Sequence, residues 1–347
     1  MIFKDLVVVE LASVLAGPLT GTFFSELGAR VIKIENRNTG GDVTRKWKLP
    51  QEDPESSVSA YYASANYNKE SILLNFKDKE DFNALITLIA DCDIVIANFK
   101  GGSAAKLGLD YDSLKKINPN LIYASLTGYG EESNRPAFDM VLQAETGFMS
   151  MTGEPDGPPC KIPVAIIDVL AAHHMKQAIL CALIEKQKTG RGKFISVCLK
   201  DAATAALVNQ ATNYLMVGKV AERMGSQHPN IAPYGDTFRT CDDRFIMLAI
   251  GTDAQFAHLC SLLKINKVLF ETNVKRLQKR HMLNQLIADE IKTKGFDYWQ
   301  TEFNNMGIPY SKINSVAEHL NQEDVRKDLL RESIEGVDTI RPRTALI

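Results

Sequence analysis

Asp168 is the residue of this chain whose type and position point most directly to chemistry. It follows an apolar run at residues 163–167 and opens a helical pattern that stops at a Thr-Gly-Arg-Gly sequence at residues 189–192. An aspartate there is typical of a helix N-cap, because its oxygen accepts a hydrogen bond from an otherwise unpaired backbone N–H. The same N–H groups favour the ionised carboxylate, the form that can act as a nucleophile. The residue pattern leaves both roles open.

A turn of small residues near the N-terminus is a second candidate site. Ser13, Val14, Ala16 and Gly17 stand between a predicted strand and a predicted helix. Backbone N–H groups at such a turn can receive an anion, or a ribose and adenine edge. A tight strand-to-helix connection without any ligand explains the same residues equally well.

Histidines and cysteines do not form a metal-binding pattern. His173 and His174 follow Asp168 by just over one helical turn, but no carboxylate or cysteine stands at ligand spacing from them. The six cysteines are scattered and include no CxxC pair, which is typical of reduced thiols in the cytoplasm. We therefore predict a cytoplasmic protein with no metal and no redox cofactor.

The first half of the chain must supply the elements that position these residues. It alternates short β-branched runs with helical patterns, which is typical of an α/β fold with a mostly parallel, doubly wound sheet. Ligands of such sheets bind beyond the carboxyl ends of the strands, so the turns at 13–18 and 98–102 should lie at the site. The predicted strands are 6–11, 30–34, 71–76, 93–98 and 121–126, and the predicted helices are 19–27, 78–90 and 112–117.

The second half of the chain predicts a further, smaller α+β domain. A breaker-rich stretch at 225–233 indicates a domain boundary, and 237–250 can form two strands around a turn at Asp242 and Asp243. The predicted helices of this half are 168–188, 201–217, 254–263, 280–293 and 296–306.

Composition argues against two classes of partner. The chain has 40 basic and 42 acidic residues and a formal net charge of -2, so no field of one sign favours nucleic acid. The apolar stretch at 6–19 is interrupted by Glu10 and by a Gly17-Pro18 turn, and no run approaches the ~18 apolar residues of a membrane span. We expect a soluble protein with neither nucleic acid nor membrane as partner.

Six segments form an ordered set of motifs. They are VELASVLAGP at 9–18, LGARVIKIE at 27–35, NFK at 98–100, LGL at 107–109, YASLTGYG at 123–130 and GFMSMTG at 147–153. In this order they resemble the class III CoA-transferases, or CaiB/BaiF family. That family includes formyl-CoA transferase and carnitine CoA-transferase, with α-methylacyl-CoA racemase as a sister group. Further likeness at 189–192 and 228–234 extends the resemblance over nearly the whole chain.

The resemblance implies an interlocked homodimer of two-domain chains. A large Rossmann-like, CoA-binding domain would occupy 1–218, and a linker with the small domain would occupy 219–309. The C-terminal segment, 310–347, would return to the large domain.

The resemblance also implies CoA transfer from an acyl-CoA donor to a small carboxylate acceptor, with coenzyme A as a substrate. Asp168 matches the family nucleophile, which forms a covalent aspartyl intermediate. The residues expected to bind CoA are Ser13, Val14, Ala16, Gly17, Arg37, Asn98, Phe99, Lys100 and Lys106. Those expected to line the substrate pocket are Leu15, Phe138, Asp139 and Gln143.

Two positions depart from the family pattern. Leu15 stands where some members have a glutamine that handles the acyl group. Lys100 stands where arginine is common, which keeps the charge but loses bidentate contact with phosphate.

Three other functions compete with CoA transfer. An α-methylacyl-CoA racemase needs proton donors and acceptors on both faces of the α-carbon. In racemases a histidine precedes the aspartate that matches Asp139, and this chain has Phe138 there. A non-catalytic CoA-binding protein would not need Asp168. A nicotinamide dehydrogenase would carry G-x-G-x-x-G after the first strand, which this sequence lacks.

Overall fold

The computed structural model describes residues 1–346, which fall into two compact units. Unit 1 contains residues 1–148, 161–220 and the chain from Lys327 onward. Unit 2 contains Met149–Cys160 and Ala221–Arg326. The chain therefore leaves unit 1 and returns to it twice.

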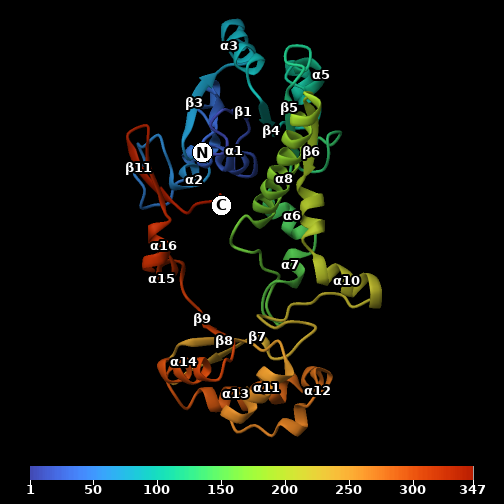
Figure 1. Ribbon diagram of the computed structural model, residues 1–347, viewed down its shortest axis with the longest axis vertical. Helices are drawn as coiled ribbons and strands as arrows, with labels where there is room; N and C mark the ends of the chain where they lie inside the picture. Colours follow the sequence, from blue (N-terminus) through green and yellow to red (C-terminus); the bar gives the residue numbers. More distant parts are fainter. Residues whose placement is uncertain (347) are drawn as a thin grey trace. The chain divides into compact units, whose positions relative to one another are not determined.

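A six-stranded parallel sheet forms the centre of unit 1 (Figure 1). The strand order is β3-β2-β1-β4-β5-β6, so the order reverses between β1 and β4 as in Rossmann folds. The predicted α/β fold with a parallel sheet is confirmed, although the last strand, β6, was not among the predicted ones. The strands are β1 Val7–Leu11, β2 Arg30–Asn36, β3 Lys69–Leu74, β4 Ile94–Ala97, β5 Ile122–Thr127 and β6 Lys193–Cys198.

Helix α1, Ala16–Glu26, begins just after β1 and packs closely against it. Pro18 is the third residue of the helix, where its missing N–H costs no hydrogen bond. A Cβ atom at Gly17 would overlap the Cβ of Ala12, and one at Gly21 would overlap the carboxylate of Glu10. The two glycines therefore allow the close approach of α1 to β1.

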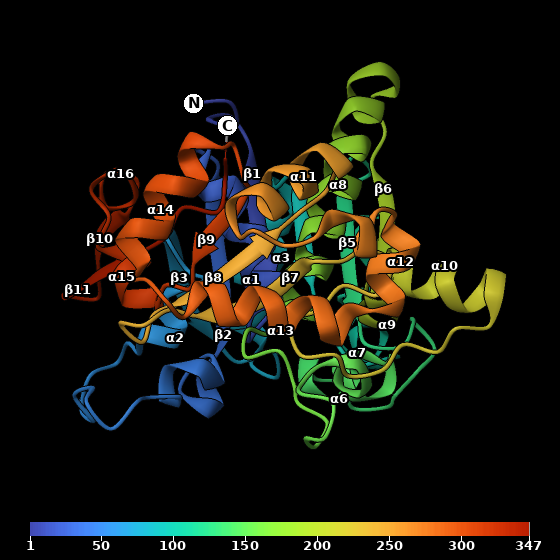
Figure 2. The same cartoon turned by 90° about the horizontal axis from the view of Figure 1, so that it is seen from below.

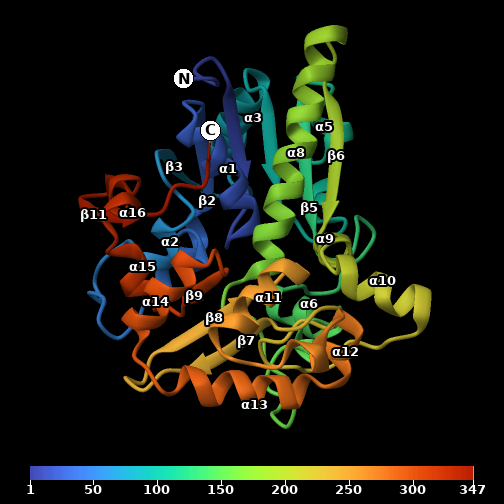
Figure 3. The same ribbon diagram turned by 60° about the horizontal axis from the view of Figure 1, so that its bottom comes forward.

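Helix α8, Ile166–Thr189, lies beside β5 and β6 and also packs against α1 (Figures 1 and 3). Its buried residues recur at three- and four-residue spacing, as Ala171, Met175, Ile179 and Ala182 show. Within residues 1–346, α8 is the one helix long and apolar enough to cross a membrane. The core helix of a globular protein meets the same two criteria.

The other helices of this part of the chain are short, with the exception of α3. The predicted helix 201–217 is two helices, α9 and α10, because the backbone of Val208 is left-handed with a φ of 38°. The remaining elements are η1 Arg37–Thr39, η2 Val43–Lys46, α2 Ala60–Ala63, α3 Lys79–Ala90, α4 Ser103–Leu107, α5 Tyr111–Leu114, α6 Asp139–Glu145, α7 Phe148–Met151, α9 Leu199–Ala205 and α10 Val208–Val217.

The last part of the chain packs on unit 1. Strands β10 (Leu330–Ile334) and β11 (Val337–Arg341) form an antiparallel hairpin. Arg341 pairs with the buried carboxylate of Glu26, which also accepts hydrogen bonds from the backbone N–H groups of Thr344 and Ala345 at 2.9 and 2.7 Å. We expected this return to begin at residue 310. It begins at Lys327 instead, because β9 pairs with β8 in unit 2.

Unit 2 is a small α+β unit with its own core. Its antiparallel sheet has the order β7-β8-β9, and helices α11, α13 and α14 lie around it (Figure 2). The core includes Ile246 and Leu248 of β8, Ile287 of α13, and Trp299 and Phe303 of α14. The elements are β7 Tyr234–Arg239, β8 Phe245–Ala249, α11 Asp253–Leu262, η3 Lys267–Phe270, α12 Asn273–Gln278, α13 Arg280–Ile291, α14 Phe296–Asn305, β9 Tyr310–Lys312, α15 Val316–Leu320 and α16 Glu323–Lys327.

Candidate active site

A small cavity in unit 1 contains Asp168. Its volume is about 110 Å³, and it lies between the turn after β1, the end of β5 and the first turn of α8. The order of the strands reverses between β1 and β4, and ligands of open α/β sheets bind beyond the strand ends at such a point. The lining residues are Ser13, Val14, Leu15, Ala16, Asn98, Leu126, Thr127, Gly128, Ala137, Phe138, Asp168 and Leu199.

A larger groove of about 580 Å³, lined by both polar and apolar residues, adjoins this cavity, because Ser13 and Asn98 line both hollows. Phe99 and Lys100, two of the residues predicted to bind CoA, line the groove. Lys46 also lines it and was not predicted from the sequence. The groove therefore combines two phenylalanine rings, Phe76 and Phe99, with three lysines, Lys33, Lys46 and Lys100, beside the cavity of Asp168.

Asp168 is the third residue of α8 and not its N-cap. The helix begins at Ile166, and its N-cap, Ala165, has no side chain that can accept a hydrogen bond. The carboxylate of Asp139 takes that role, because its Oδ1 accepts hydrogen bonds from the N–H groups of Ile167 at 2.7 Å and Asp168 at 3.4 Å. The N-cap prediction for Asp168 is wrong, and its side chain is left to line the cavity.

The electrostatic expectation for Asp168 is also wrong. We expected the helix start to keep its carboxylate ionised, yet burial raises the pKa of Asp168 to about 7, with a further contribution from the negative charge of Asp139. The residue is only 9% exposed. The loss of hydration therefore raises the pKa by more than the N–H groups at the start of the helix lower it. Two of these N–H groups already donate to Asp139.

Asp139 and Gln143 lie behind Asp168 and do not line the cavity. The amide Nε2 of buried Gln143 donates to Oδ2 of Asp139 at 2.7 Å, and its Oε1 accepts from the N–H of Ile162 at 2.8 Å. These bonds fix α6 against the segment that leads into α8. The two predicted pocket residues that do line the cavity are Leu15 and Phe138.

Three of the predicted CoA-binding residues line neither hollow. Arg37 donates to the backbone O of Leu73 and pairs with Asp81 at 2.9 Å, so its guanidinium is already engaged at the surface. Lys106 lies on α4, whose other residues Ser103 and Leu107 line the groove. Gly17 packs against Ala12.

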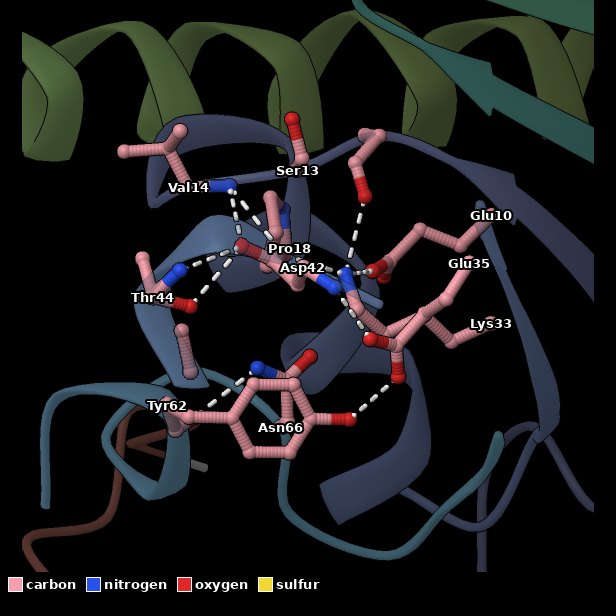
Figure 4. Close-up of polar contacts among 12 residues, drawn as sticks. Glu10, Ser13, Val14, Pro18, Lys33, Glu35, Asp42, Thr44, Tyr62 and Asn66 are labelled. Atoms are coloured by element: carbon pink, nitrogen blue, oxygen red, sulfur yellow. Dashed lines mark hydrogen bonds and ion pairs between the residues drawn. The ribbon is translucent and has the colours of Figure 1, made fainter. Parts of the chain in front are cut away.

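The turn after β1 is held by two polar side chains. The amide of Asn98 donates to the O of Ser13 at 2.9 Å, and its Oδ1 accepts from the N–H of Ser13 at 3.2 Å. The N–H of Val14 donates to the carboxylate of Asp42 at 3.2 Å, and Lys33 pairs with the same carboxylate (Figure 4). Asp42 was missed in the sequence. The signal that could have revealed the cluster is the charge of Glu10 and Lys33 inside otherwise apolar strands.

Among residues 1–346, no group of three or more His, Cys, Asp or Glu side chains is arranged to hold a metal ion. His173 lies on α8, where burial lowers its pKa, with smaller contributions from Lys176 and His174.

Comparison with known proteins gives matches over nearly the whole chain. The sequence profile of CoA-transferase family III matches residues 3–343. A succinate–glutarate CoA-transferase of Agrobacterium fabrum is 39% identical over 353 residues, covering 98% of this chain and 88% of that protein. A succinyl-CoA:glutarate CoA-transferase of Homo sapiens is 36% identical over 316 residues, covering 89% of this chain and 71% of that protein. The crystal structure of a CAIB/BAIF family protein from Brucella suis is similar with a TM-score of 0.85 and 39% identity, covering 99% of this chain and 92% of that one.

Proposed function

The chain belongs to CoA-transferase family III, and we propose that it moves coenzyme A from an acyl-CoA to a carboxylate through a covalent intermediate on Asp168. The observation that carries the proposal is a buried carboxylate in a small cavity beside a larger groove that contains three lysines. The groove suits the phosphates and adenine of CoA, and the cavity suits the acyl group. An acyl-CoA lying across Ser13 and Asn98 would bring its thioester to Asp168.

Each step of the proposed reaction is a nucleophilic substitution at an acyl carbon, in which one bond to that carbon forms and another breaks. A carboxylate oxygen of Asp168 attacks the thioester carbonyl, the C–S bond breaks, and the CoA thiolate leaves behind a mixed anhydride. The thiolate then attacks the aspartyl carbonyl and releases the donor carboxylate, which leaves an aspartyl thioester. The acceptor carboxylate attacks the carbonyl of that thioester, the C–S bond breaks, and the CoA thiolate leaves behind a second anhydride. Attack of the thiolate on the acceptor acyl group releases the new acyl-CoA and the free Asp168 carboxylate.

Water would destroy each of these intermediates by hydrolysis. Asp168 is buried, and the apolar side chains of Leu126, Ala137 and Leu199 line the cavity around it. Apolar side chains next to the carboxylate offer no hydrogen bonds to water close to an anhydride or a thioester. This arrangement supports transfer of CoA to a carboxylate over hydrolysis.

We propose a short dicarboxylate as donor and acceptor. The support comes from the two named relatives, whose names specify exchange between succinate and glutarate. A panel of acyl-CoA donors against mono- and dicarboxylate acceptors, followed by mass spectrometry, tests the class. Higher kcat/KM for monocarboxylates than for succinate and glutarate would contradict it.

An interlocked homodimer and a cytoplasmic location are also part of the proposal. Helix α10 supports the dimer, because Leu215, Met216 and Val217 are 79%, 77% and 76% exposed in the single chain. Consecutive exposed apolar side chains of this size are typical of an interface. All six cysteines are free thiols, which supports a reducing compartment.

The experiment that tests the covalent step is Asp168→Asn combined with trapping by hydroxylamine. Asparagine keeps the shape of the side chain but is not a nucleophile, so transfer should fall by about 10⁴-fold or more. The wild-type protein incubated with acyl-CoA should give a hydroxamate on the peptide that contains Asp168.

Asp139→Asn is the matched control. It removes a carboxylate next to Asp168 that does not line the cavity, so this variant should still form the hydroxamate on Asp168. Near wild-type transfer by Asp168→Asn, or an adduct on another residue, would show that Asp168 is not the nucleophile.

A further inference from the structure

The backbone of Val14 has a conformation that its side chain disfavours. Its φ is 73°, in the left-handed region, where a β-branched residue is a genuine outlier. Val14 lines the cavity of Asp168 and directly precedes Leu15, the N-cap of α1. Such a conformation persists only where neighbouring groups impose it.

The carboxylate of Asp42 is placed to impose it. Its Oδ1 and Oδ2 lie 3.3 and 3.2 Å from the N of Val14, which donates to them. Asp42 is buried, and its Oδ1 also accepts from the N–H and the hydroxyl of Thr44 at 3.0 and 2.8 Å. The carboxylate therefore has a fixed position from which to hold the turn.

A buried lysine fixes the other oxygen of Asp42. Lys33 Nζ lies 3.0 Å from Oδ2 of Asp42, 3.0 Å from Oε1 of Glu10 and 2.8 Å from the O of Ala12 (Figure 4). These three acceptors use all three donors of the ammonium group. Glu10 is in turn held by Lys69 at 2.8 Å. The strands β1, β2 and β3 thus present Asp42 to the turn through a rigid set of ion pairs.

Stability alone is a poor reason for so many buried charges. Removing ions from water is costly, and replacing a buried ion pair by apolar residues of similar volume is often neutral or stabilising. This cluster lies next to a turn that lines the cavity of the nucleophile, and its Lys33 and Asp42 also line the adjoining groove. A role in the geometry of that turn explains why charges are found there.

We propose that Asp42, fixed by Lys33, is a positioning residue for CoA transfer. It holds Val14 in the left-handed conformation and so places Leu15 and Ala16 at the edge of the Asp168 cavity. The first N–H groups of a helix have no intrahelical acceptor, so those at the start of α1 are available to the thioester oxygen as negative charge develops on it. This inference rests on the proposed function, because the reaction being positioned is attack by Asp168.

The test measures Asp42→Asn in two backgrounds. In the wild-type background, Asp42→Asn should lower kcat by roughly 100-fold while KM for acyl-CoA changes by less than about threefold, because misplacement by about 1 Å has costs of this size. In the Val14→Gly background the same change should lower kcat by less than about tenfold, because glycine adopts a positive φ without an anchor. Equal losses in the two backgrounds would overturn the proposal.

Thr44→Val is the matched control for a purely structural role. It removes one hydrogen bond to the same carboxylate but leaves the bond to Val14, so it should lower Tm while kcat stays within about twofold of wild type. A loss of kcat like that of Asp42→Asn at a similar Tm would contradict positioning. If Asp42→Asn does not fold, the double variant Lys33→Gln/Asp42→Asn, which removes both charges, replaces it. Its loss of kcat should likewise be smaller in the Val14→Gly background.

A second readout does not depend on activity. In a crystal structure of Asp42→Asn, or of its Lys33→Gln combination, Val14 should leave the positive φ region. A retained φ near 73° would overturn the role of Asp42 even if CoA transfer itself is confirmed. If the wild-type protein does not transfer CoA but the φ of Val14 still changes in Asp42→Asn, the result would instead count against the proposed function.

Discussion

Asp168 should control the pH dependence of the reaction. Burial and the charge of Asp139 raise its pKa to about 7, and only the ionised carboxylate can attack a thioester. We expect kcat/KM to rise with pH through about 7 and then level off, whereas an ordinary aspartate would give a plateau down to about pH 4. Asp139→Asn removes the neighbouring charge and should move the rising limb to lower pH. If kcat/KM rises over the same pH range in Asp139→Asn, a group other than Asp168 controls the pH dependence.

The raised pKa of Asp168 also predicts that its ionised carboxylate lowers the free energy of unfolding. The folded-state pKa of Asp168 lies above the unfolded value of about 4, so the folded state binds the proton more tightly and loses stability as pH rises from about 4 to 7. Asp168→Asn should therefore raise the free energy of unfolding at pH 8 by roughly 2–4 kcal/mol and change it little at pH 4. Urea unfolding at both pH values measures the difference. An equal effect at the two pH values would contradict the assigned charge state.

The presence of Phe138 in the cavity predicts that the protein does not racemise 2-methylacyl-CoA. It lines the cavity of Asp168 at the position where racemases have a histidine, and its ring cannot move a proton. In heavy water, deuterium incorporation at the α-carbon of a 2-methylacyl-CoA should be at least about 100-fold slower than CoA transfer, because general acid–base catalysis contributes at least that factor. Comparable rates would favour the racemase.

Among the secondary-structure elements, the contact between β1 and α1 should be sensitive to one added methyl group. A Cβ at Gly17 would overlap the Cβ of Ala12, so Gly17→Ala must push α1 away from β1. We expect a loss of about 1–3 kcal/mol in the free energy of unfolding, together with reduced transfer, since α1 starts at the cavity. Gly251→Ala is the control, because its Cβ would meet its nearest neighbour at an ordinary 3.6 Å. Equal Tm values for the two variants would contradict the close packing.

The elements differ in how far the sequence could predict them. Four of the five predicted strands, β1, β2, β4 and β5, are short, β-branched and mostly buried, whereas β3 is a largely exposed edge strand. β6, the other exposed edge strand, was not predicted from the sequence. The break at Val208 depends on an unusual φ that no residue type signals. At the site, motif likeness led to Asp168, but the capping by Asp139 and the anchor Asp42 depend on long-range contacts that spacing does not contain.

At the scale of the whole molecule, α10 should decide the oligomeric state. Leu215→Lys with Met216→Lys places two charges among exposed apolar side chains, and should shift a dimer toward monomer with loss of activity. Sedimentation at micromolar concentration measures the mass. Ile2→Lys, an exposed apolar residue at the N-terminus, is the control and should leave the mass unchanged. A stable and active wild-type monomer would contradict the proposed homodimer.

The return of the chain to unit 1 has a consequence for biosynthesis. The ribosome makes Glu26 and Arg45 early, but their partners Arg341 and Glu335 emerge only after all of unit 2. Until then the nascent chain cannot complete unit 1, because the Glu26 carboxylate has no cation at its buried position. A premature stop after residue 326 would thus spare every residue of the proposed site and still leave that unit unfinished. In a cell, such a product is expected to be degraded by proteases rather than to persist as a weaker enzyme.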